Sequence, residues 1–104
     1  MISTYDITMM ILEELMETLS EEFLQTVRRT CEVIDQILEE EDMIDFEAER
    51  KEEVLQLKLL IPEEQGSLVI WRQDIMQRIS QCQASVEITT DDTKNLVIIL
   101  AIRL

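Results

Sequence analysis

The stretch from Ile7 to Leu38 constrains the fold most, because it lacks glycine and proline and carries an apolar pattern of helical period. Its large apolar residues recur in steps of three or four, at Leu12, Leu15, Leu19, Phe23, Val27, Cys31, Ile34 and Leu38. That spacing places them on one side of an α-helix. A helix of roughly thirty residues is a rod of about 45 Å, which cannot bury this stripe on itself. We therefore expect one long helix over residues 5–40, with other segments packed along it.

Four successive acids, from Glu39 to Asp42, follow this stretch. Acids at the C-terminal end of a helix oppose its dipole and repel one another, so the chain should turn here. A second helix is predicted over residues 45–60, with Phe46 and Val54 on one apolar line. A helix that continues through the acids is the competing interpretation, since no glycine or proline enforces the break.

Pro62 sets the next boundary, because proline does not fit inside a helix but suits the first turn of a new one. A third helix is predicted over residues 62–84, with Trp71 and Ile75 on its apolar stripe. Trp71 is interpreted as a core anchor rather than a platform for a ligand.

The tail of the chain allows two interpretations. Thr90, followed by two aspartates, has the pattern of a helix cap with acids in the first turn, which favours a fourth helix over residues 91–103. The largely β-branched run 96–99, together with Val86 and Ile88, could instead form a β-hairpin. We favour the helix, because an isolated two-stranded hairpin is only marginally stable.

These elements predict an all-α fold, either an antiparallel helical hairpin with coiled-coil packing or a three-to-four-helix bundle, in a single domain of residues 1–104. One glycine and one proline leave little material for turns. Aromatic residues make up 4 % of the chain and methionine occurs six times, so the core should be aliphatic and adaptable.

The net charge of −14, without any histidine, limits the partners of this protein. Such a surface repels phosphates and anionic lipids, so we expect neither nucleic-acid binding nor membrane insertion, and a basic protein is the natural partner. Cys31 and Cys82 lack metal-ligand spacing and are expected to be free thiols in a reducing cytoplasm. The chain shows no signal peptide or membrane span, so a soluble, cytoplasmic protein is expected.

No catalysis and no cofactor or metal are predicted, because the chain lacks histidine for a nucleophilic triad and has one glycine, too few for a phosphate-binding loop. Residues 96–104 are almost all aliphatic, more than one helix face needs. They would be buried in the core, in a second copy of the chain or in a partner. The residues predicted to contact a partner are Trp71, Ile75, Leu96, Ile99, Leu100 and Ile102.

Residues 33–42 read as an apolar helix that runs into an acidic turn, and residues 46–51 and 54–57 then supply Arg50, Lys51 and a leucine-rich helix. This order resembles the FlgN/FliT kind of type III (flagellar) export chaperone over roughly residues 20–85. The resemblance implies a small cytosolic protein that holds an aggregation-prone secretion substrate by helix-on-helix packing. It implies no particular site residues.

Two alternatives rest on the acids. Glu13, Glu14 and Glu17, with Glu39 and Asp42 further on, resemble the Glu-Glu-x-x-Glu and Glu-x-x-Asp motifs of MazG-like all-α nucleotide pyrophosphatases. That resemblance implies Mg²⁺ held by carboxylates and bound to the phosphates of a nucleotide. The concentration of acids in residues 32–53 would alternatively suit a DNA mimic that blocks a basic protein.

Overall fold

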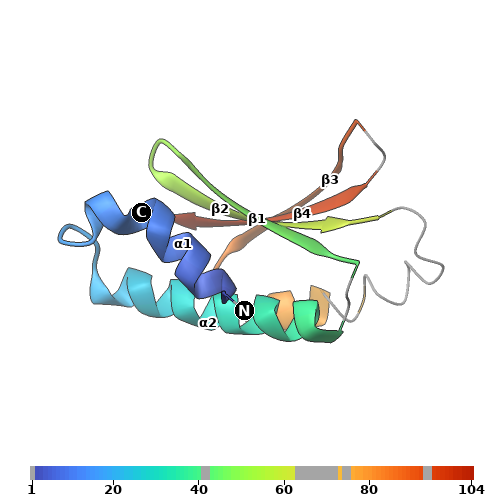
Figure 1. Cartoon of the computed structure of the whole chain (residues 1–104), viewed down its shortest axis with the longest axis horizontal. Coiled ribbons are helices and arrows are strands. Elements are labelled where there is room, and N and C mark those ends of the chain that lie inside the picture. Colours follow the sequence, from blue (N-terminus) through green and yellow to red (C-terminus); the bar gives the residue numbers. More distant parts are fainter. Residues whose placement is uncertain (1, 41–42, 63–72, 74–75, 93–94) are drawn as a thin grey trace.

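The computed structural model describes residues 2–40, 43–62, 73, 76–92 and 95–104. Its elements along the chain are α1 (Thr4–Leu12), a 3-10 turn η1 (Glu13–Leu15), α2 (Glu21–Glu40), β1 (Asp45–Lys51), β2 (Val54–Ile61), β3 (Ser85–Thr90) and β4 (Leu96–Arg103). Residues 73 and 76–79 are also helical. The fold is therefore α+β, with α1 and α2 on one side of an antiparallel sheet (Figure 1). The predicted all-α helical hairpin or bundle, with its coiled-coil packing, is wrong.

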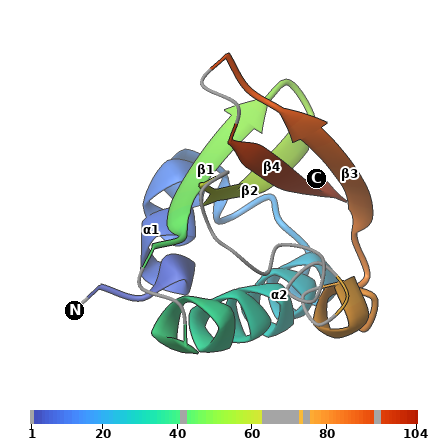
Figure 2. The same cartoon turned by 90° about the vertical axis from the view of Figure 1, so that its right-hand side faces the viewer.

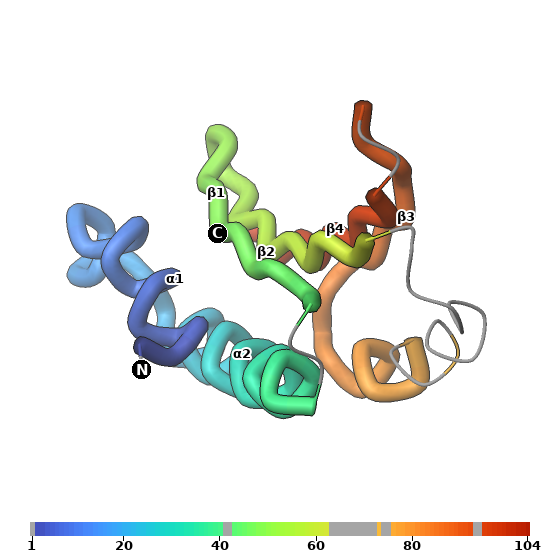
Figure 3. Tube along the Cα trace, turned by 45° about the vertical axis from the view of Figure 1, so that its right-hand side comes forward, coloured from blue at the N-terminus to red at the C-terminus, as the bar shows by residue number. Residues whose placement is uncertain are grey.

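The four strands form one antiparallel sheet in the order β1-β2-β4-β3, so that β2 and β4 are central. Leu57 of β2 lies opposite Leu100 of β4, and both side chains are fully buried. β1 and β3 form the two edges, and α1 lies on the β1 side of the sheet (Figure 2). Both helices lie on the same side of the sheet (Figure 3), where they enclose the core.

The predicted helix over residues 45–60 is wrong, because this segment forms the β1–β2 hairpin. In β2, Leu55, Leu57, Leu59 and Ile61 are buried, whereas the residues between them are half-buried. A period of two places the buried four on one face of a sheet. Six of the eight residues in β2 are apolar, so this segment fits a helical period as well as a strand period.

The turn between β1 and β2 carries no sequence signal. Lys51 pairs with Val54, which leaves Glu52 and Glu53 as a two-residue loop. Glu52 has a positive φ of 54°, a conformation usually supplied by glycine or asparagine in such turns. The left-handed conformation of a glutamate destabilises the fold by about 1 kcal/mol. A glutamate is also not a residue type that predicts a turn.

The predicted fourth helix over residues 91–103 is also wrong, and the tail forms the alternative β-hairpin of β3 and β4. The Asn95 N–H donates to the Asp91 carboxylate at 2.9 Å, and the Asp91 N–H donates to the Asn95 carbonyl at 3.1 Å, which closes the turn. This hairpin is not isolated, because β4 also pairs with β2. Val97 and Ile98 are both buried, which explains the unbroken apolar run of a central strand.

The single helix predicted over residues 5–40 is divided into α1, η1 and α2. The Leu15 carbonyl accepts the N–H groups of Thr18 and Leu19, at 2.8 and 3.2 Å, and so ends the first part. Ser20 then caps α2, since its hydroxyl accepts the Phe23 N–H at 3.1 Å. α1 folds back along α2, which buries the apolar stripe against both α1 and the sheet.

Most of the predicted third helix, residues 62–84, falls outside the described residues. Within the described part, residues 76–79 are helical and Ile79 is fully buried. Neither α1 nor α2, nor any other helical segment that the structure describes, has the length and apolar character needed to cross a membrane.

Candidate partner-binding groove

A groove of about 470 Å³ opens where the start of α1, the last turns of α2 and β1 meet. We call it the acidic groove. Its lining residues are Ile2, Ser3, Thr4, Ile7, Asp35, Leu38, Glu39 and Phe46. A volume of this size accommodates a small ligand, or one or two side chains of a protein partner.

Hydrogen bonds fix the wall that α1 and α2 share. The Ser3 hydroxyl accepts the Asp6 N–H at 3.1 Å and caps α1. The Thr4 N–H donates to the Asp35 carboxylate at 3.1 Å, and the Thr4 hydroxyl donates to the Cys31 carbonyl at 3.1 Å. The start of α1 is therefore held on α2 at two points, which keeps the groove open in a defined shape.

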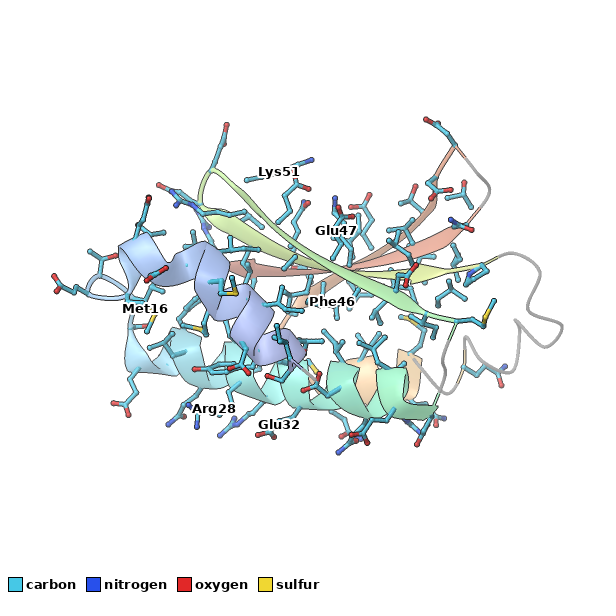
Figure 4. All side chains as sticks on the ribbon, viewed as in Figure 1. Met16, Arg28, Glu32, Phe46, Glu47 and Lys51 are labelled. Carbon is cyan, nitrogen blue, oxygen red and sulfur yellow. The ribbon has the colours of Figure 1, made fainter. Side chains whose placement is uncertain are left out.

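The floor of the acidic groove is apolar. Phe46 lies between the sheet and the helices, whereas its neighbour Glu47 lies on the opposite side of the sheet (Figure 4). Ile7 and Leu38 are half-buried, and Ile2 at the rim is 65 % exposed. A partner that covers this surface gains about 25 cal/mol for each Å² of apolar area removed from water.

The rim of the groove is negative. Asp35 and Glu39 supply two carboxylates, and none of the eight lining residues is basic. The last turn of α2 also contains no basic residue, so Glu39 adds to the negative end of the helix dipole. Arg78 pairs with Glu40 at 2.8 Å, whereas the Glu39 side chain makes no hydrogen bond or ion pair with any residue that the structure describes. The groove is therefore suited to a cation beside an apolar group.

The polar side chains of the described groove lining are two hydroxyls and two carboxylates. The two hydroxyls, on Ser3 and Thr4, are both engaged in the hydrogen bonds described above. Beneath α1, burial raises the pKa of the Cys31 thiol, and burial likewise raises the pKa of the half-buried Cys82 thiol. Both therefore remain protonated and weakly nucleophilic at neutral pH. The described residues also contain no cluster of three or more His, Cys, Asp or Glu able to hold a metal ion.

The carboxylates implied by the MazG-like resemblance do not come together. Glu13 and Glu14 lie in η1, and Glu17 lies in the turn before α2. Glu39 is at the opposite end of α2, and the helix from Glu21 to Glu39 spans roughly 27 Å. Asp42 lies outside the described residues.

The residues predicted to contact a partner lie elsewhere. Leu96, Leu100 and Ile102 of β4 are buried in the core beneath the helices, and Ile99 is half-buried on the opposite face of the sheet. Trp71 and Ile75 lie outside the described residues. Whether any of the six contacts a partner stays a prediction.

Sequence reasoning missed the acidic groove, although a signal for part of it was present. Ile2 and Ile7 occupy the positions just before the Ser3 cap and four residues after it, the pattern of a hydrophobic staple at a helix start. The approach of Asp35 and Phe46 to that staple depends on the turn before α2 and on the β1–β2 hairpin, neither of which was predicted.

Comparisons of the chain with protein families, with curated proteins and with solved structures found no match. The chemistry of the acidic groove is therefore the basis for a function. An apolar floor beside two carboxylates is chemically suited to a group that is both apolar and positively charged.

Proposed function

We propose that this protein is a non-catalytic, protein-binding chaperone or adaptor. Its acidic groove holds a segment of a partner that presents an apolar side chain next to a lysine or arginine. One observation carries this proposal: the apolar floor and the exposed Ile2 side chain lie beside carboxylates, and none of the eight described lining residues is basic.

The two properties of the groove act together. Cover of the apolar floor supplies most of the affinity, as when an amphipathic helix binds in a groove. Glu39, at the negative end of α2, favours partners that place a cation at the rim. The net charge of −14 attracts such segments and repels acidic ones before contact.

An export chaperone of the FlgN/FliT kind is one form of this proposal. Its client would have to present a basic, apolar segment to the acidic groove. The leucine-rich helix that the resemblance implied after the acidic turn is replaced by the β1–β2 hairpin, so helix-on-helix packing through that segment is not retained. The pyrophosphatase alternative is less favoured, because Glu13, Glu14 and Glu17 lie far from Glu39.

A synthetic amphipathic leucine–lysine helix, carrying a fluorescent label, serves as the probe for the groove. Ile2→Ser should weaken its binding about fivefold, because a rim contact worth about 1 kcal/mol is lost. Met10→Ser is the matched control, since Met10 on α1 is 70 % exposed and lies outside the groove lining. Neither change should alter the fold.

The charge is tested separately with Glu39→Gln and its matched control Glu32→Gln. Glu32 lies on the same helix, on the face turned away from the sheet (Figure 4). We expect several-fold weaker binding for Glu39→Gln and less than about a twofold change for Glu32→Gln. Equal losses for Glu39→Gln and Glu32→Gln would mean that the probe follows the general charge of the protein. Equal losses for Ile2→Ser and Met10→Ser would mean that it binds exposed apolar side chains anywhere on α1. Either result would contradict the proposal.

A photoreactive amino acid in place of Ile2 extends the test to the native cell. It should cross-link to a partner protein, and the cross-link should be lost when Glu39→Gln is added. The same photoreactive group in place of Met10 should not capture that protein. Identical cross-links from both positions would contradict a groove-specific partner.

A further inference from the structure

β3 is an edge strand in which all six residues are exposed. It pairs with β4 on one side, and no described residue hydrogen-bonds to its other side. In an antiparallel pair, alternate residues direct their N–H and C=O groups away from the partner strand. With respect to the part of the chain that the structure describes, half of the β3 residues therefore present a row of unpaired donors and acceptors.

The side chains of β3 continue the inner layer of the sheet. Val86 and Ile88 lie opposite Leu100 and Ile98, so they belong to the face that covers the core. They are nevertheless 37 % and 42 % exposed, whereas Leu100 and Ile98 are fully buried. A further strand beside β3 would cover both side chains and extend the apolar layer.

β3 has little of the usual protection of a free edge, since Glu87 is its one charged residue. Its sequence, Ser-Val-Glu-Ile-Thr-Thr, contains no lysine and no proline, and four of its residues are β-branched. Natural proteins block such edges with charges, proline or a covering element, because an open edge pairs with any suitable strand.

We propose that β3 is a strand-addition site for an extended segment of a partner in which apolar and basic residues alternate. The apolar side chains of that segment would lie over the inner face beside Val86 and Ile88. Its lysine or arginine side chains would lie on the outer face, where Glu87 stands in the middle of β3. Opposite charges on neighbouring strands stabilise such a pairing.

Charge argues against a second copy of the chain as the added strand. A symmetric β3–β3 pairing centred on the strand would bring two Glu87 carboxylates opposite or diagonal to each other. It would also join two molecules that each carry a net charge of −14. The strand-addition site is independent of the acidic groove, because the groove includes β1, at the other edge of the sheet.

The probe is a synthetic peptide of about ten residues in which valine and lysine alternate. The reference peptide has the same composition, but two valines and two lysines follow each other in turn, so that valine and lysine no longer alternate. On the isotope-labelled full chain, the alternating peptide should slow hydrogen exchange of alternate β3 amides by about tenfold or more. The reference peptide should leave these amides unchanged. Binding of both peptides without slower exchange in β3 would overturn the proposal.

Two neighbouring substitutions separate strand packing from charge. Ile88→Lys places a positive charge on the inner face, and Thr89→Lys places the same charge on the outer face. We expect Ile88→Lys to weaken binding of the alternating peptide at least about tenfold more than Thr89→Lys does. Equal losses would indicate attraction by net charge alone and would contradict strand addition.

A change in the peptide provides a test that does not depend on folding of a variant. Two versions carry N-methyl groups, one on the valine amides and one on the lysine amides. One version should lose binding and the other should keep it, because only one edge of the added strand donates to β3. Full binding by both would overturn the proposal.

Self-association is checked by sedimentation without peptide. A dimer with protected β3 amides would assign this edge to a second copy and refute the partner strand. Loss of peptide binding at β3 would leave the groove tests with Ile2→Ser and Glu39→Gln unaffected, so the two proposals fail separately.

Discussion

The two edges of the sheet differ in how they are protected. β1 carries five charged residues among its seven, and α1 packs against it. Its Glu49 also forms a 2.8 Å ion pair with Lys58 of β2. β3 carries only Glu87, and every residue along it is exposed. Charge and the packing of α1 protect β1 from further strands, whereas β3 has a single charge and is exposed along its whole length.

The largest expected effect separates the supported centre of the sheet from its open edge. Leu57→Ala should lower the free energy of unfolding by about 2–5 kcal/mol, because it leaves a cavity in the core. Ile88→Ala on β3 should cost less than about 1 kcal/mol, since that side chain already contacts water. Urea denaturation monitored by circular dichroism measures both. Equal losses would show that β3 is as integral to the core as β2.

A smaller effect is expected when the cover of β1 is loosened. Asp35→Ala removes the acceptor of the Thr4 N–H and should cost about 1 kcal/mol. Hydrogen exchange of the β1 amides should accelerate, because α1 no longer rests firmly beside that edge, whereas β3 amides should be unchanged. Asp35→Asn keeps an acceptor oxygen and serves as the control. Acceleration in both edges alike would mean that α1 supports the whole sheet rather than β1.

The smallest effect concerns the ion pair between Glu49 of β1 and Lys58 of β2. The hydrogen bond from Lys58, and then its charge, lower the pKa of the Glu49 carboxyl below its ordinary value of 4.5. Because the folded-state pKa is the lower one, the pair adds stability above the ordinary value and loses it as the pH falls through the folded-state pKa. In a carbon-13 NMR titration, Lys58→Met should raise the Glu49 pKa. An unchanged pKa would show that the pair contributes nothing to this edge.

Sequence reasoning placed one unbroken helix over residues 5–40, a range that includes α2, and named the β3–β4 hairpin as an alternative, but it missed the hairpin of β1 and β2. The apolar residues of β2 are so dense that periods of two and of three to four fit equally well. Only the turn could decide between them, and Glu52 adopts its left-handed conformation without glycine or asparagine. Ser20 is a residue type that often caps a helix, but the apolar stripe continues on both sides of it and therefore favoured an unbroken helix.

The candidate sites depended on the same missed turns. The pairing of Ile2 with Ile7 around Ser3 is visible in the sequence, but its neighbours Asp35 and Phe46 come from elements that meet only in the folded chain. β3 became an edge because β4, not β3, pairs with β2. Strand order is a property of long-range packing, and local patterns carry little information about it.

The order of the strands has a consequence for synthesis on the ribosome. β4 is the last of the four strands to be made, yet it stands between β2 and β3. Until residues 96–103 emerge, β2 has only β1 beside it, and a two-stranded hairpin is marginal alone. On the nascent polypeptide, the Leu55-to-Ile61 row therefore lacks its neighbour β4 until then, and a chain truncated before Leu96 would expose one edge of β2 and be prone to aggregate.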